Sequence, residues 1–400
     1  MMMHSSNAPP FGSSPGELGA AQPVLLPELD YPLIGAALAL LGLGLVMISS
    51  STLHVYSQQP FYFVIRHAIA LLAGAIAALI VYRIPIHLWR TFGGVFFVIG
   101  LLLLTLLMIP GVGHEVNGAT RWFRPFGVSI QPSEFVKLFA ILYIAGYLAR
   151  HQQEITASAW AFLRPLLLII LACALIMWQP DFGTVGVIVV TTMGMLFLGG
   201  VALHYFGILF ALAASALVSL VLISPYRMSR MTSFTDPWAD VHDGGYQLAQ
   251  ALIAFGRGEW SGVGLGNGIQ KQFYLPEAHT DFIMAVIGEE LGLLGSLLVI
   301  SLFAVIVWRA FAIGAAAERL GNMFAAWLAQ GLGLWLAIQS AVNIGVNIGA
   351  LPTKGLTLPL MSYGGNSIVI ACVAIAILVR IDRENRQRLT TQNAREVWAV

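Results

Sequence analysis

Long apolar runs that alternate with short polar segments dominate the chain. Ten of them lie near 31–51, 62–82, 92–109, 134–149, 162–178, 184–203, 205–224, 281–308, 322–348 and 366–381. A helix crosses a bilayer with about 20 predominantly apolar residues, so each run predicts one membrane-spanning helix. The pattern therefore predicts an all-α polytopic membrane protein with ten spans and one large loop, residues 225–280, before the eighth.

Composition supports this fold class and excludes several functions. Of the 400 residues, 58% are hydrophobic and 10% are charged, whereas a soluble domain carries about 25% charged residues. The net charge of +1 and the lack of a Walker or Rossmann glycine fingerprint give no support for a nucleic-acid partner or a nucleotide site. Cys173 and Cys372 both lie in apolar runs, which predicts small buried side chains and no metal site or disulfide.

The positions of the arginines predict the orientation. Short loops that carry arginine mark the cytoplasmic side of a membrane protein. One face receives Arg83, Arg90, Arg150, Arg164, Arg309, Arg319 and the cluster from Arg380 to Arg395. With ten spans, both termini are then cytoplasmic, and segments 110–133, 225–280 and 349–365 lie outside. We expect a disordered cytoplasmic tail over 1–30, a membrane domain over 31–381 and a cytoplasmic tail over 382–400.

The large outer loop combines aromatic and acidic residues. Trp238, Tyr246 and the apolar stretch 248–255 predict a short amphipathic helix on the membrane surface. Three aspartates could bind a divalent cation through oxygen, but their spacing lacks the EF-hand pattern, and a solvated acidic turn is the preferred interpretation. They are Asp236, Asp240 and Asp243.

Asp281 marks the border between this polar loop and an apolar span. An aspartate that opens a helix often serves only as a cap. Its neighbours favour a functional site, because His279 and Glu277 precede it and Glu289 and Glu290 lie about 12 Å deeper along the same helix. Carboxylates at that depth are costly unless they are paired or face a wet cavity.

Two similar phrases, Gln131–Glu134 and Gln179–Asp181, each open a span that enters from outside. Glu134 and Lys137 are three residues apart and therefore share a helical face. A buried pair of this kind needs further partners, such as Asp181. Two interpretations remain open: an ion-pair network that fixes helix packing, or direct contact with a substrate.

Two further outer segments carry candidate binding groups. Arg121, beside Trp122, could grip a phosphate with its planar guanidinium. Segment 343–367 contains prolines and glycines that prevent a continuous helix, and such backbone is tolerated at membrane depth where it lines a cavity. We expect it to bend over the outer surface or dip into it, so that Lys354, Thr357, Ser362 and Tyr363 line the same cleft as Asp281.

Several motifs, in order along the chain, resemble those of the SEDS family (shape, elongation, division and sporulation), and more its division branch than its elongation branch. They are Ala119–Trp122, Gln131–Glu134, Gln179–Thr184, Pro276–Phe282 with Gly288–Glu290, and Pro352–Pro359 followed by Ser362–Gly365. The resemblance implies a ten-helix peptidoglycan glycosyltransferase that polymerises lipid II in the bacterial inner membrane at the division septum. It also implies that Asp281 is the catalytic aspartate.

The same resemblance implies partners and a metal preference. The partners are a class B penicillin-binding protein, the transpeptidase FtsI, and the division proteins FtsQ, FtsL and FtsB. A divalent cation, Mg²⁺ or Mn²⁺, would assist the reaction, although no tight protein site for it is evident in the sequence.

The residues suit this chemistry independently. Growing a glycan needs a base for the attacking sugar hydroxyl, for which we predict Asp281, and cations for the departing polyprenyl pyrophosphate. We predict Arg121, Lys137, Lys271 and Lys354 as those cations. The remaining predicted substrate contacts are Glu134, Asp181, His279, Ser362 and Tyr363.

Two other functions remain open at this point. A lipid II flippase would use buried polar groups along a path, but transporters usually place that site near the midplane between repeated halves, and no such repeat is visible in the sequence. A scaffold that only recruits the transpeptidase would tolerate substitution of Asp281.

Overall fold

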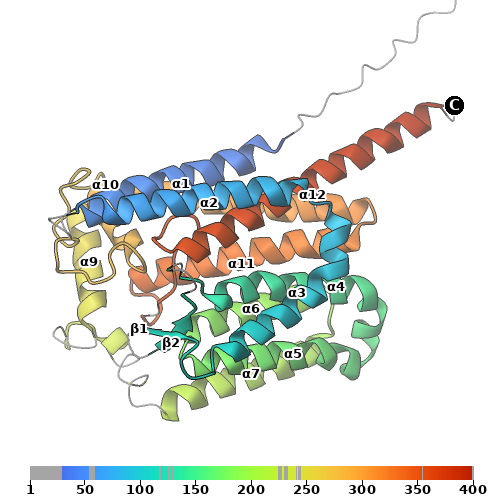
Figure 1. Ribbon diagram of the computed structural model, residues 1–400, viewed down its shortest axis with the longest axis horizontal. Coiled ribbons are helices and arrows are strands. Elements are labelled where there is room, and N and C mark those ends of the chain that lie inside the picture. The colour runs from blue at the N-terminus through green and yellow to red at the C-terminus, as the bar shows by residue number, and fades with distance from the viewer. Residues whose placement is uncertain are drawn as a thin grey trace, which may run out of the picture.

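The fold is a bundle of long apolar helices (Figure 1). The computed structural model describes residues 29–53, 59–116, 119–124, 127, 129–223, 228, 233–239, 241, 245–353 and 355–398. The helices are α1 (Tyr31–Thr52), α2 (Tyr62–Arg83), α3 (Ile86–Leu106), α4 (Pro132–Ala157), α5 (Ala159–Trp178), α6 (Phe182–Leu198), α7 (Leu203–Ile223), α9 (Tyr246–Gly258), α10 (Ile283–Arg319), α11 (Met323–Asn347) and α12 (Gly365–Trp398). The strands are β1 (His114–Val116) and β2 (Ala119–Trp122), which pair antiparallel.

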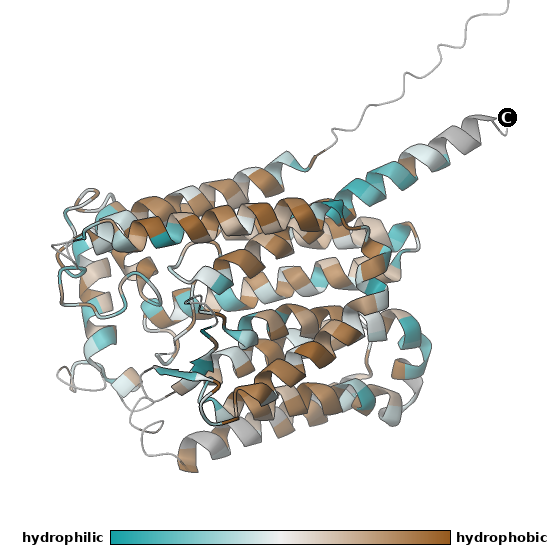
Figure 2. Ribbon diagram, viewed as in Figure 1, coloured by the Kyte–Doolittle hydropathy of each residue, from teal (hydrophilic) through white to brown (hydrophobic). Residues whose placement is uncertain are grey.

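The predicted spans all appear as helices. In the described part of the chain, eight helices are long and apolar enough to cross a membrane, namely α1 to α5 and α10 to α12. The two remaining predicted spans are α6, with 17 residues, and α7, with 21. Figure 2 shows apolar residues along the bundle and polar ones gathered at its ends and on the extension of α12. The predicted all-α polytopic fold is confirmed.

Helix α11 lies in the middle of the bundle (Figure 1) and packs against α4, α6 and α10. Helix α2 lies along α12, α1 lies along α10, and α3 and α5 pack on α4. Most side chains of α11 are buried. A polar residue on α11 is therefore held at a defined place inside the protein.

Some predicted boundaries differ from the observed ones. Helix α3 begins at Ile86, six residues before the predicted span, and α12 continues to Trp398. The segment predicted as a C-terminal tail is thus helical, because hydropathy marks where the apolar face ends and not where the helix ends. The Asn385 side chain donates a 3.1 Å hydrogen bond to the carbonyl of Ile313 in α10. Most of the predicted N-terminal tail lies outside the described residues.

Helix α10 is broken at Gly292, which has φ 67° and ψ −161°. The loop after α9 satisfies the freed backbone groups, as membrane proteins require. The Val263 and Gly264 N–H groups donate to the carbonyls of Glu289 and Glu290 at 3.0 and 3.1 Å, and Leu293 N–H donates to the Glu259 carbonyl at 2.9 Å. The predicted single span is therefore two helical segments, 283–291 and 293–319.

Helix α9 and the strand pair β1–β2 lie toward one end of the bundle (Figure 1). Helix α9 crosses that end, packs on α10 and buries Leu248, Ala249, Ala251 and Ala254. The helix predicted at 248–255 is confirmed, while its contact with the membrane surface stays a prediction. Of the three aspartates of this loop, Asp236 accepts from the backbone of a turn at 3.2 Å, and Asp240 and Asp243 lie outside the described residues.

Candidate functional site

Asp281 lies in the turn just before α10 and is half-buried. The N-cap of α10 is Phe282, which has no side-chain capping hydrogen bond. The Ala285 N–H in the first turn instead donates to Asn347 Oδ1 of α11 at 3.0 Å. Asn347 therefore supplies the capping hydrogen bond that the helix-cap interpretation assigned to Asp281.

The Asp281 carboxylate faces the segment between α11 and α12. A Cβ placed on Gly355 would lie 3.0 Å from Asp281 Oδ2, so the Gly355 backbone is directly beside the carboxylate. Gly355 itself is exposed. The carboxylate therefore sits where α10 begins, between the bundle and an exposed part of this segment. Lys354, predicted to lie in the same place, falls outside the described residues.

Residues 349–353 and 355–364 dip into the bundle, which is one of the two courses expected for this segment, and we refer to them as the dipping loop. Leu356, Leu358 and Met361 are buried, and a Cβ on Gly44 of α1 would lie 2.8 Å from the Met361 carbonyl oxygen. The Ser362 hydroxyl accepts from Leu358 N–H at 2.7 Å. Ser362 is 1% exposed, so its hydroxyl braces the loop from inside and does not face a cleft.

Tyr363 and His279 belong to an aromatic cluster beside Asp281. Tyr363 N–H donates to the His279 carbonyl at 2.9 Å, and Phe63 of α2 lies 4.7 Å from the His279 ring and 5.2 Å from the Tyr363 ring, measured between ring centroids. Burial lowers the pKa of His279, against an opposing effect of Glu277, and raises the pKa of Tyr363, against an opposing effect of Arg66. Both rings are therefore neutral near pH 7.

Arg66 joins this cluster from α2, with its guanidinium 4.8 Å from the centroid of Tyr62. It is exposed. The sequence analysis did not select it as a site residue. The signal that could have found it is its spacing of three residues from Phe63, which puts both on one helical face.

Lys137 and Glu134 form a buried pair, with Lys137 2% exposed and 2.9 Å from Glu134 Oε1. Lys137 also donates to Gln339 Oε1 at 2.9 Å, and Gln339 Nε2 donates to the Thr357 carbonyl of the dipping loop at 2.9 Å. Trp335 Nε1–H donates to the same Gln339 oxygen. The geometry favours the packing-network interpretation over direct substrate contact, with Gln339 as the third partner.

Asp181 was predicted as a partner of the Glu134–Lys137 pair, but it caps α6 instead. Its carboxylate caps α6 by accepting from Thr184 N–H at 3.3 Å and Thr184 Oγ1 at 2.9 Å, and it accepts from Ser133 Oγ at 3.4 Å. Arg121 donates to the carbonyls of Gln179 and Pro180 at 2.9 and 2.6 Å. These contacts tie β2, α4 and the α5–α6 corner together.

Lys271, Glu289 and Glu290 hold the loop after α9 on α10. Glu289 accepts from Arg257 at 2.6 Å and from Ile269 N–H at 2.9 Å. Glu290 pairs with Lys271, and both contact Ser50 Oγ of α1. Lys271 is 5% exposed and both glutamates are fully buried, so the Lys271–Glu290 pair is shielded from solvent, whereas the Arg257 side chain that pairs with Glu289 is 35% exposed.

Asn343 and Asn347 of α11 were not predicted as site residues. Each donates its Nδ2–H to the backbone carbonyl of Asp281 at 2.9 Å. The signal in the sequence is two amides four residues apart in an apolar span, which share a helical face. Both amides fix the Asp281 backbone.

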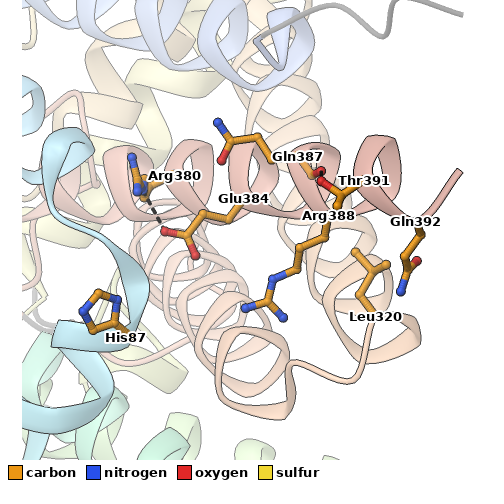
Figure 3. Close-up of a pocket in the computed structure, with 8 residues that line it drawn as sticks. All are labelled: His87, Leu320, Arg380, Glu384, Gln387, Arg388, Thr391 and Gln392. Atoms are coloured by element: carbon orange, nitrogen blue, oxygen red, sulfur yellow. Dashed lines mark hydrogen bonds and ion pairs between the residues drawn. The ribbon is translucent and has the colours of Figure 1, made fainter. Parts of the chain in front are cut away.

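A hollow of about 550 Å³ lies at the other end of α12 (Figure 3). His87 at the α2–α3 corner, Leu320 after α10, and Arg380, Glu384 and Arg388 of α12 contribute to its lining. Arg380 is already paired with Glu384 at 2.9 Å. The hollow is remote from Asp281 and contains none of the predicted site residues. Among the described residues, no group of three or more His, Cys, Asp or Glu side chains is placed to hold a metal ion.

Comparisons with known proteins agree along most of the chain. The family model described as "Cell cycle protein" (FtsW, RodA, SpoVE) matches residues 31–387. Relatives named "Probable peptidoglycan glycosyltransferase FtsW" are 56% identical over 357 residues in Allochromatium vinosum, covering 88% of this chain and 90% of the relative, and 52% identical over 363 residues in Nitrosococcus halophilus, covering 90% and 94%.

Solved structures show the same fold. A chain from work described as "Structural coordination of polymerization and crosslinking by a peptidoglycan synthase complex" has a TM-score of 0.75 at 28% identity, covering 90% of this chain and 99% of that one. The rod shape determining protein RodA of Thermus thermophilus has a TM-score of 0.66 at 25% identity, covering 89% and 97%.

Proposed function

Because the chain belongs to the FtsW, RodA and SpoVE family, which is the SEDS family its motifs resemble, we propose that it polymerises lipid II into glycan strands with Asp281 as the general base. Its identity as a peptidoglycan glycosyltransferase follows from the high identity to relatives of that name. The observation that carries the proposed site is the half-buried Asp281 carboxylate, whose backbone is fixed by two amides and whose Oδ2 lies against exposed Gly355.

The proposed reaction joins two sugars and releases a pyrophosphate. The 4-hydroxyl of the acceptor sugar attacks the anomeric carbon of the donor, the bond from that carbon to the polyprenyl pyrophosphate breaks, and Asp281 takes the hydroxyl proton. A positioned base of this kind typically contributes about 10²–10⁴ in rate. His279 and Tyr363, neutral and beside Asp281, would contact the sugars.

The leaving pyrophosphate needs positive charge that is not already neutralised. Lys137 and Lys271 are buried and paired with Glu134 and Glu290, so we assign them to the framework. We assign charge stabilisation to Lys354, which adjoins Gly355 in the sequence, and to exposed Arg66 beside Tyr363. Since the described residues offer no metal cluster, no step of this proposal uses the divalent cation.

We also propose the setting of the reaction. A similar solved chain comes from a complex that couples polymerization and crosslinking, which supports a class B penicillin-binding protein, FtsI, as partner, with FtsQ, FtsL and FtsB around it. The arginine-bearing loops support an inner-membrane orientation with cytoplasmic termini and Asp281 on the periplasmic face. The FtsW relatives support the division septum as its location.

The test is glycan synthesis from purified lipid II by this protein with its transpeptidase, comparing the unmodified chain with Asp281→Asn. We expect loss of polymer of at least about 100-fold while complex formation and thermal unfolding stay unchanged. Wild-type polymer from Asp281→Asn would exclude the base. Absence of polymer from both proteins, together with lipid II crossing vesicle membranes, would favour a flippase.

A further inference from the structure

We propose that Asn343 and Asn347 of α11 are positioning residues that hold Asp281 and the dipping loop in register for proton transfer. This inference rests on the proposed role of Asp281. Both amides donate to the backbone carbonyl of Asp281, and Asn343 also donates to the segment opposite it.

Asn347 controls the start of α10. It is fully buried, accepts from Ala285 N–H at 3.0 Å and donates to the Asp281 carbonyl at 2.9 Å and to the Asn343 carbonyl at 2.8 Å. Only an amide combines an acceptor with two donors in this size. One side chain therefore caps the helix and fixes the residue that precedes its N-cap.

Asn343 joins the two sides of the site. Its Nδ2 donates to the Asp281 carbonyl at 2.9 Å and to the Leu356 carbonyl at 2.6 Å. Leu356 directly follows Gly355, whose backbone lies beside Asp281 Oδ2. A single buried amide thus sets the spacing between the proposed base and the loop across from it.

The break in α10 explains why Asp281 needs this amide clamp, by which we mean the contacts of Asn343 and Asn347 with Asp281 and Leu356. The segment that carries Asp281 at its start is only residues 283–291, because Gly292 separates it from the rest of the helix. A short segment has few hydrogen bonds of its own to fix its end. Small displacements matter, since a misplacement of about 1 Å can cost about 100-fold in rate.

The test uses Asn343→Leu and Asn347→Leu, which keep side-chain size and remove the polar atoms. We expect kcat for polymerisation to fall by about 10–100-fold with KM for lipid II changed far less, the pattern of a lost transition-state interaction. Ser340→Ala is the matched control: it is also a buried polar residue of α11, but its hydroxyl contacts only its own helix. It should retain wild-type kcat.

A second variant separates capping from positioning. Asn347→Asp keeps an oxygen for Ala285 N–H but has no N–H for the Asp281 carbonyl. We expect hydrogen exchange at the start of α10 to stay slow while kcat falls. Wild-type kcat in Asn343→Leu and Asn347→Asp, with Asp281→Asn inactive, would overturn this inference alone. Full activity of Asp281→Asn would overturn the proposed base and the clamp with it.

Discussion

Two segments pack against α10, one at its break and one at its start, and they are fixed by different chemistry. The loop after α9, residues 259–271, is held by a charged anchor, consisting of Arg257, Lys271, Glu289 and Glu290. The dipping loop is held by an amide anchor, consisting of Gln339, Asn343 and Asn347, which is connected to Asp281 and to the loop backbone.

The contrast shows what each kind of anchor is suited to. Buried ion pairs hold firmly, but each charge must be neutralised locally, and a lone buried charge is very costly. Amides hold with directed hydrogen bonds and carry no net charge, so they can fix the proposed base without adding a charge beside it. The charged anchor therefore serves the framework, whereas the amide anchor contacts the proposed base, Asp281.

The largest loss of stability should come from disturbing the close backbone contact between Gly262 and Glu290, next to the charged anchor. A Cβ on Gly262 would lie 2.1 Å from the Glu290 carbonyl oxygen, so Gly262→Ala should prevent the loop from closing the break in α10 and abolish the yield of monodisperse protein. Gly266→Ala is the control, because Gly266 also has positive φ, 84°, but no atom lies within 4 Å of its added Cβ. Equal yields of the two variants would contradict this account.

Breaking the charged anchor should cost slightly less. Lys271→Met leaves Glu290 without its cation and should destabilise the protein by about 3–5 kcal/mol, seen as a lower unfolding temperature in detergent. The double variant Lys271→Met with Glu290→Leu should recover much of this loss, since no lone charge remains. A double variant no more stable than Lys271→Met would refute the charge argument.

The dipping loop should respond more mildly. Ser362→Ala leaves the buried Leu358 N–H without its 2.7 Å acceptor, which should cost about 1–3 kcal/mol. Hydrogen exchange should quicken at 356–363 and stay unchanged at 262–270. Faster exchange in both segments would show that the two anchors are not independent.

The smallest effect concerns pH. Burial holds the folded-state pKa of His279 below its ordinary value of 6.5, so the unfolded chain binds the proton first as pH falls. The stability that neutral His279 provides is complete above pH 6.5 and declines as pH falls below it. The unfolding temperature of His279→Gln should therefore decline less than that of the unmodified chain between pH 6.5 and 5. If the unfolding temperatures of both proteins fell equally with pH, His279 would not contribute to the pH dependence.

Local patterns in the sequence predict the helices and part of the site. Hydropathy finds a helix at each of the ten predicted spans, and a spacing of three residues finds the Glu134–Lys137 pair. The break at Gly292 escapes prediction, because one glycine barely alters hydropathy and its partners lie about 30 residues earlier. Asn343 and Asp281 are 62 residues apart, and Lys271 and Ser50 are 221 apart, so periodicity carries no information on which pairs meet.

The length of α12 has a practical consequence. Its 34 residues make a rod about 51 Å long, whereas the hydrocarbon core of a bilayer is about 30 Å thick. Figure 1 shows its last turns projecting beyond the bundle, at the end away from α9. A fluorophore or gold particle attached there would stay out of the lipid and turn with the whole molecule. Its movement along the membrane could be followed from this handle without disturbing Asp281.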